Sequence, residues 1–230
     1  MPPADPVLSL TERLLQLAST RQAVTDLQRY FGIGSATDSP PYTGSHFEHL
    51  GGGGDRAESA HTVTPEDLIA VQTLSVQVPV RVALDLLQGS LGEQVSTLLR
   101  DIPADLDLAH ADPCHVQQGS PADQAWHLLY RQPHVGWVTA GKLLAHKRPR
   151  LLPVYDHVVR CALGRPASWW ISLHAALQAH DQALHHRLLN LRGAAAVPTS
   201  VSALRICDVV VWMGHCDSHR NAHCTGLAMP

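Results

Sequence analysis

Prolines divide residues 126–165 into short segments, and the positions of these prolines constrain the fold more than any other feature of the sequence. Proline lacks the amide hydrogen that a helix interior needs, so Pro133 stops one apolar segment, while Pro149 and Pro153 stop the next. Between these breaks, good helix formers and apolar residues recur at helical spacing. The run is therefore expected to form a helix, a tight turn at 134–136, a second helix, an extended link and a third helix.

Helix-start signals extend the same organisation to the rest of the chain. Thr64 and Ser120 are N-cap residues, each followed by a proline at the first helical position and by acidic residues in the first turn. Apolar periodicity predicts further helices over residues 7–31, 82–87, 91–100, 167–180, 185–191 and 203–213. The predicted fold class is thus mainly α, with at most one short strand or hairpin near residues 42–50.

A chain of 230 residues can bury a substantial core, and it divides most simply into one main domain with smaller flanking parts. We expect an N-terminal helix and glycine-rich loop region over 1–62, a helical domain over 63–213 and a disordered tail over 214–230. The glycines at 51–54 lack the Lys-Ser/Thr ending of a P-loop, so they predict a flexible turn rather than a nucleotide site.

The compartment follows from three features of the sequence. No apolar run approaches the roughly 20 residues that cross a bilayer, and the N-terminus lacks the basic region of a signal peptide. The five cysteines are odd in number and are not spaced as a disulfide framework. We therefore expect a cytoplasmic protein with reduced thiols and no membrane partner.

Positive charge is concentrated in one part of a chain that is acidic overall. The formal net charge is -3, yet residues 126–165 contain seven Lys or Arg and a single acidic residue. Localised positive charge is the footprint expected of a phosphate-binding face, and the total charge conceals it. The alternative interpretation is a solvated helix face that happens to be basic.

The same run resembles the helix-hairpin-helix element of the DNA glycosylase and endonuclease III superfamily. The matching segments are Pro133-His134-Val135-Gly136, Thr139-Ala140, Val154-Tyr155-Asp156-His157-Val158-Val159-Arg160 and Leu163-Gly164. The resemblance covers about forty residues in the order and spacing of that superfamily. It implies a helical domain that contains a helix-hairpin-helix motif.

The resemblance, together with the basic residues, implies contacts with the DNA backbone. In such a hairpin the N–H groups that open the second helix, together with the helix dipole, form a site for a phosphate. The candidate DNA-binding residues are His134, Val135, Gly136, Thr139, Lys142, Lys147, Arg148 and Arg150. The resemblance also implies a monovalent cation at the hairpin carbonyls; no other cofactor is expected. An ordinary packed pair of helices is the structural alternative.

The catalytic aspartate of the superfamily is the point at which this sequence departs most. Tyr155 occupies the matching position and Asp156 follows one residue later, so Asp156 is the candidate acid, with Tyr155 or His157 assisting. An aspartate before a helix is also explained as an N-cap. We therefore predict sequence-independent DNA-backbone binding by a catalytically degenerate protein. The alternatives are an active base-excision glycosylase or lyase that uses Asp156, and a non-enzymatic interaction or structural module.

The C-terminal tail and a tryptophan pair carry two weaker patterns. Cys216, His219, His223 and Cys224 have a spacing that could reach a tetrahedral zinc ion. Because 16 histidines are spread through the chain, such clusters arise by chance, and no metal is predicted. Trp169 and Trp170 could stack on an extruded base, but their helical context favours the core.

A second resemblance covers the first half of the chain. The segments TGSHFEHLGGGGD and TPEDLIAVQTLSVQVP are similar to those of an uncharacterised bacterial domain family that carries a comparable hairpin run. This resemblance implies no activity. It indicates that the occurrence of this first half and the hairpin in one chain is not a chance combination.

Overall fold

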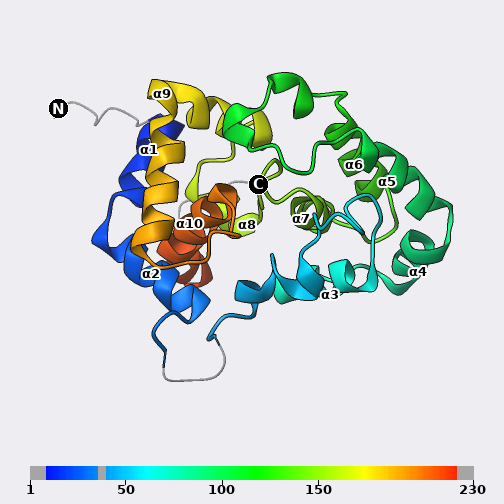
Figure 1. Ribbon diagram of the computed structural model, residues 1–230, viewed down its shortest axis with the longest axis horizontal. Helices are drawn as coiled ribbons and strands as arrows, with labels where there is room; N and C mark the ends of the chain where they lie inside the picture. The colour runs from blue at the N-terminus through cyan, green and yellow to red at the C-terminus, as the bar shows by residue number, and fades with distance from the viewer. Residues whose placement is uncertain (1–8, 36–39, 222–230) are drawn as a thin grey trace.

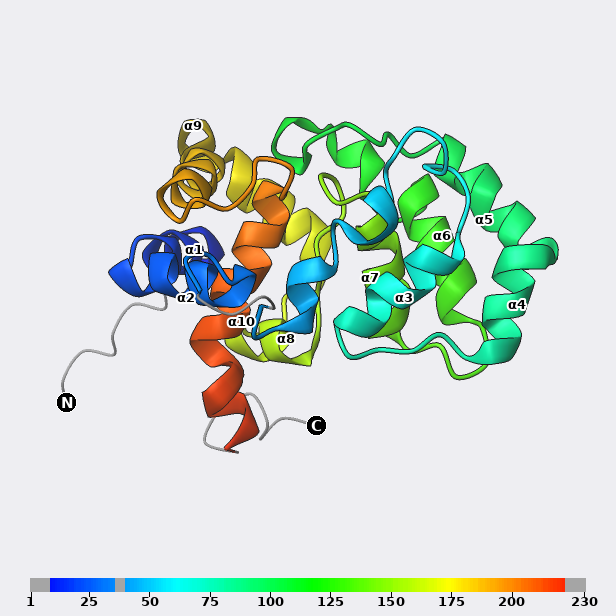
Figure 2. The ribbon, with the colours of Figure 1, turned by 60° about the horizontal axis from the view of Figure 1, so that its bottom comes forward.

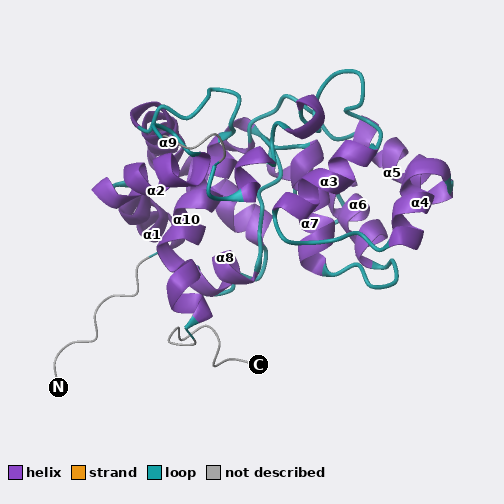
Figure 3. Cartoon of the chain, turned by 90° about the horizontal axis from the view of Figure 1, so that it is seen from below, coloured by secondary structure: helices purple, strands orange, loops and turns teal. Residues whose placement is uncertain are grey.

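The computed structural model describes residues 9–35 and 40–221, and within these ranges the chain consists of helices and loops without a strand (Figure 3). The prediction of a mainly α fold is therefore confirmed. No helix among these residues is both long enough and apolar enough to span a membrane.

The helices form two lobes that lie side by side (Figures 1 and 2). The middle lobe contains α3 (Pro65–Thr73), α4 (Val80–Gln88), α5 (Ser90–Arg100), α6 (Pro121–Tyr130) and α7 (Trp137–Lys147). The terminal lobe contains α1 (Leu10–Ala18), α2 (Arg21–Phe31), α8 (His157–Ala162), α9 (Trp169–Ala194) and α10 (Ala203–Arg220). The first and last of the described helices thus share one lobe. The expected helical domain over 63–213 is divided between the lobes, because α8, α9 and α10 lie with α1 and α2.

Side-chain caps explain where several of these helices begin. Thr64 accepts from the Asp67 amide while the Asp67 carboxylate accepts from the Thr64 amide, which is a capping box at the start of α3. Ser120 caps α6 and Ser202 caps α10 in the same direction. The two starts predicted from the sequence, at Thr64 and Ser120, are both present.

Two predicted elements take a different form. Residues 7–31 do not form one helix, because the chain breaks at Ser19 and Thr20 and Thr20 caps the separate helix α2. The suggested strand near 42–50 is replaced by two 3-10 helices, Thr43–His46 and Leu50–Gly52. Amides of these two segments bond to carbonyls three residues earlier, so they do not pair with another segment as the amides of a strand would.

The C-terminal boundary also differs from the expectation. Helix α10 continues to Arg220, so a disordered tail cannot begin at 214. Its first half, Ala203–Val211, is wholly buried and runs through the centre of the terminal lobe. Helices in proteins are stabilised mainly by packing, and the burial of this half therefore stabilises α10.

The predicted turn between α6 and α7 is present and compact. His134 adopts a left-handed backbone with φ of 60°, a conformation that a glycine would enter at lower cost. Val135 folds inward and is 6% exposed. Helix α7 then enters the middle lobe with nearly all of its side chains buried, so it is a core helix rather than a surface one.

Candidate functional site

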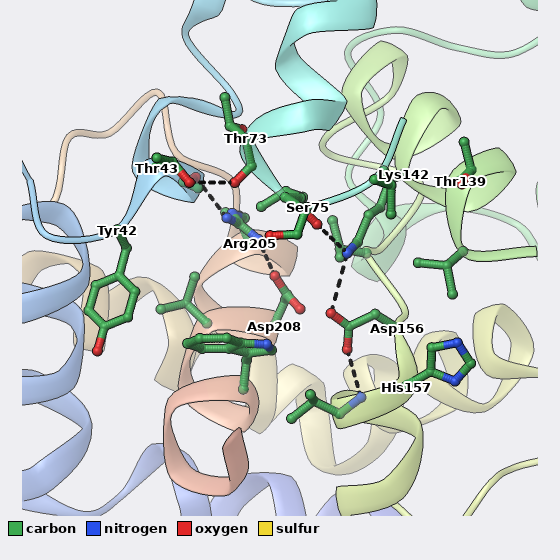
Figure 4. Close-up of a pocket in the computed structure, with 18 of the residues that line it drawn as sticks. Tyr42, Thr43, Thr73, Ser75, Thr139, Lys142, Asp156, His157, Arg205 and Asp208 are labelled. Carbon is green, nitrogen blue, oxygen red and sulfur yellow. Dashed lines mark hydrogen bonds and ion pairs between the residues drawn. The ribbon is translucent and has the colours of Figure 1, made fainter. Parts of the chain in front are cut away.

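A cavity of about 700 Å³ lies between the two lobes. Its walls are the N-terminal half of α7, the start of α8, the side of α10, the end of α3 and the segment around Thr43 (Figure 4). Because both lobes contribute, the cavity exists only when the whole chain is folded. Ligand sites of proteins are commonly placed between packed units in this way.

Lys142 enters this cavity from α7 and is 5% exposed. Its ammonium group donates to the Leu74 carbonyl at 2.9 Å and lies 3.4 Å from the Asp156 carboxylate (Figure 4). Burial lowers the pKa of Lys142 below its usual value, and the negative charges of Asp156 and Asp208 oppose that shift. The site therefore holds an amine that loses its proton more readily than a lysine in water.

Asp156 has two roles, one for each carboxylate oxygen. Oδ1 accepts from the amides of Val158 and Val159, each at 3.0 Å, and so caps α8. Oδ2 faces Lys142 across the cavity. The interpretation of Asp156 as an N-cap is confirmed, and the ion pair is a second function that the sequence did not reveal.

A second charged group lines the cavity from α10. Arg205 pairs with Asp208, and its guanidinium donates to the Tyr30 hydroxyl at 2.6 Å and to the Gly44 carbonyl at 2.9 Å. Burial raises the pKa of Asp208 to about 6, although Arg205 opposes the shift. Sequence reasoning missed these residues because the pair lies within a valine-rich helix and its partners are distant in sequence.

The prediction that Lys147 and Arg148 bind DNA is wrong, because both side chains are fully buried and cannot reach a phosphate. The Lys147 ammonium binds the Asp67 carboxylate at 3.0 Å and the Ser59 carbonyl at 2.9 Å. The Arg148 guanidinium donates to backbone carbonyls of Ala60, Leu99 and Ile102. Buried cations need such partners, and these two anchor the end of α7 to α3, to α5 and to the loops at residues 59–60 and 102.

The remaining predicted DNA-binding residues divide between the cavity and the surface. Gly136 and Thr139 line the cavity at the start of α7, whereas His134 is exposed outside it and Val135 is buried. Arg150 lies apart from the cavity and pairs with Asp107 at 2.6 Å. The candidate DNA-binding surface at the hairpin therefore contains fewer residues than the basic run of the sequence suggested.

The two predicted helpers of Asp156 face different surroundings. His157 is exposed and lines the cavity. The Tyr155 ring instead stacks on Trp169 with ring centroids 4.9 Å apart, on the other side of the α8 start. Trp169 is 6% exposed, in agreement with the expectation that it belongs to the core. Of the two predicted helpers, only His157 lines the cavity with Asp156.

The use of lysine is a signal that could have singled out Lys142. The chain has 17 Lys and Arg residues, and Lys142 and Lys147 are the only lysines among them. Arginine thus supplies the positive charge everywhere else, and both lysines lie in the buried helix α7. One satisfies a core carboxylate, whereas the other faces a cavity, where a lysine amine can do chemistry that a guanidinium cannot.

Comparisons with known proteins place the chain in a family without assigning an activity. Searches against curated proteins and against solved structures found no match. A family model described as "Family of unknown function (DUF6308)" matches residues 23–215. That match spans most of the chain and includes Lys142, Asp156 and Arg205. The chain therefore belongs to the DUF6308 family.

Proposed function

We propose that this protein binds DNA with its hairpin and acts on an abasic nucleotide held in the cavity between the lobes, with Lys142 as the nucleophilic amine. The observation that carries the proposal is the Lys142–Asp156 pair, which opens into a cavity of about 700 Å³. The helix-hairpin-helix resemblance supplies the substrate class. The proposal corresponds to the lyase activity of base-excision enzymes.

The chemistry proceeds through an imine. The neutral Lys142 amine adds to the C1′ aldehyde of the ring-opened abasic sugar, and the adduct takes up one proton from solvent and loses one water to form a protonated imine. The Asp156 carboxylate, 3.4 Å from the nitrogen in the free protein, then takes a proton from C2′. The C3′–O bond breaks, the phosphate leaves with its electron pair, and water hydrolyses the imine to restore Lys142.

The start of α7 is the proposed phosphate contact. Gly136 is the N-cap of this helix and has no side chain that could accept from the first backbone amides of α7. Residues 136–139, which carry these amides, line the cavity. Free amides and the positive end of the helix dipole favour an anion at this position. Because Lys147 and Arg148 are buried, we expect the interface to involve few phosphates. The monovalent cation implied by the resemblance stays a prediction.

Gly136→Asp tests this contact. A Cβ at Gly136 meets no neighbouring atom and φ is -79°, so the backbone accepts a side chain. We expect the new carboxylate to cap α7, which stabilises the fold by roughly a few tenths of a kcal/mol relative to glycine. By occupying the amides and repelling phosphate, it should weaken binding to a duplex with a stable abasic analogue at least about 10-fold.

Gly136→Ala is the matched control, because it adds only a Cβ and should leave affinity nearly unchanged. Binding is measured over a series of salt concentrations. For two or three phosphate contacts, log affinity should fall against log salt with a slope of about -2 to -3. Wild-type protein that does not bind at low salt, or Gly136→Asp that binds as tightly as wild type, would contradict the proposed contact.

The pH profile of imine formation gives a further prediction. Only the neutral amine attacks, so the rate should rise with pH, with its midpoint below the usual lysine value because burial lowers the pKa of Lys142. The negative charge of Asp156 raises that pKa, so Asp156→Asn should move the midpoint to lower pH. Asparagine also caps helices well and should preserve α8. A midpoint that moves upward in this variant would contradict the pairing.

A catalytically degenerate DNA-binding protein is the second candidate function. The engagement of Asp156 Oδ1 by two backbone amides favours it, because those bonds are fully explained by capping. Under this alternative the protein binds the duplex with the same salt dependence but forms no imine. A structural or interaction module, the third alternative, would not bind DNA at all.

A further inference from the structure

Three side chains that commonly bind metals meet where the end of α8 packs against the last turns of α10. The ligand atoms of Cys161, His215 and His219 all lie within 4.8 Å of one another. His215 Nε2 is 3.3 Å from Cys161 Sγ, and all three residues are partly buried. We propose that Cys161, His215 and His219 bind one Zn²⁺ ion.

The geometry suits a tetrahedral ion. His215 and His219 are four residues apart on one helix and therefore project from the same face. Zinc bonds of about 2.3 Å to sulfur and 2.0–2.1 Å to nitrogen place neighbouring ligand atoms about 3.3–3.6 Å apart. Binding would therefore draw the three ligand atoms, which lie within 4.8 Å of one another, to that spacing. The fourth position is open to water or to another ligand.

The chemistry of the three donors is also suitable, because zinc in proteins binds neutral imidazole nitrogens and thiolate sulfurs. A thiolate at Cys161 would place one negative charge beside the ion.

The other candidate sets are weaker. Asp107, His110 and His185 also lie close together, but the Asp107 carboxylate is already bound to Arg150 at 2.6 Å. In the tail set, whose spacing was noted in the sequence without a metal being predicted, Cys216 is buried and its sulfur contacts the Met213 carbonyl and Asp217 instead. His223 and Cys224 lie outside the described residues. Of the tail set, His219 is the residue that the structure places in the three-residue cluster with Cys161.

The ion would connect two of the helices that border the cavity, α8 and α10. Helix α8 begins after Asp156 and carries Cys161 near its other end, while α10 carries Arg205 and Asp208. An ion bound only by the folded chain stabilises it by mass action. The zinc site does not depend on the proposed DNA chemistry, so either proposal can fail without the other.

The test measures metal binding by the full-length chain after removal of bound metals with a chelator. Zinc is titrated in competition with a coloured chelator, and cobalt is used as a spectroscopic substitute. We expect one zinc per chain, an increase in the unfolding temperature, and a cobalt–thiolate absorption band. Because the loss of a second-layer contact already weakens metal sites 10–100-fold, Cys161→Ser and His219→Gln should weaken binding more than about 100-fold.

Three variants control for adventitious binding. Cys114→Ser changes an exposed cysteine, Cys216→Ser tests the tail set, and His110→Ala tests the second cluster; all three should keep full zinc binding. Absence of stoichiometric zinc, or of the thiolate band in cobalt-loaded wild type, would overturn the proposal even if a variant failed to fold. Zinc that survives Cys161→Ser but is lost in Cys216→Ser would assign the ion to the tail set and also overturn the proposal.

Discussion

Replacing Lys142 by arginine is expected to lower the rate of strand cleavage at an abasic site more than about 100-fold. Arginine keeps the positive charge and can still pair with Asp156, so the fold and duplex affinity should change little. Its guanidinium stays protonated at all ordinary pH values and cannot form an imine. The measurement is the single-turnover cleavage rate of an abasic duplex, with duplex affinity measured on the same samples.

Lys147→Arg is the matched control, because it makes the same change at the chain's only other lysine. Lys147 is fully buried against Asp67, and it has no access to the cavity. Cleavage per folded molecule should therefore remain close to that of the wild type. A Lys142→Arg variant that cleaves at the wild-type rate would show that another amine, or no amine, performs the reaction.

The second large effect concerns stability. Arg148→Ala is expected to lower the free energy of unfolding by about 3–5 kcal/mol, because it removes a fully buried cation and leaves its carbonyl acceptors without a donor. Those acceptors are the carbonyls of Ala60, Leu99, Ile102 and the neighbouring Lys147. Urea unfolding followed by circular dichroism measures the change.

Arg100→Ala provides the comparison, since Arg100 is exposed at the end of α5 and its loss should change stability by less than about 1 kcal/mol. The folded Arg148→Ala protein should bind a duplex as tightly as wild type. A stable Arg148→Ala protein with weakened DNA binding would instead indicate that Arg148 reaches the surface and contacts phosphate, as the sequence first suggested.

Local signals predicted much of the fold. Proline positions and the N-caps at Thr64 and Ser120 correctly placed the helices around the hairpin, because caps and breaks depend on neighbouring residues. The capping role of Asp156 was predicted for the same reason. Its pairing with Lys142 was not, because that contact depends on how the two lobes bring the start of α8 to α7.

The basic run shows why the candidate site could be predicted only in part. A count of charges does not distinguish a solvated face from a buried helix, and the partner of Lys147 lies 80 residues earlier in the sequence. The cavity wall formed by Arg205 and Tyr30 joins residues 175 positions apart. The sequence shows that the chain has only two lysines, but only the structure shows which of them faces a cavity.

The most direct test of Lys142 as the nucleophile is reductive trapping. Wild-type protein is incubated with an abasic duplex and sodium borohydride, and the linked peptide is identified by mass spectrometry. We predict one covalent adduct per chain, attached at Lys142 and absent from Lys142→Arg. An adduct on the N-terminal amine, or no adduct under conditions where the duplex is bound, would contradict the account.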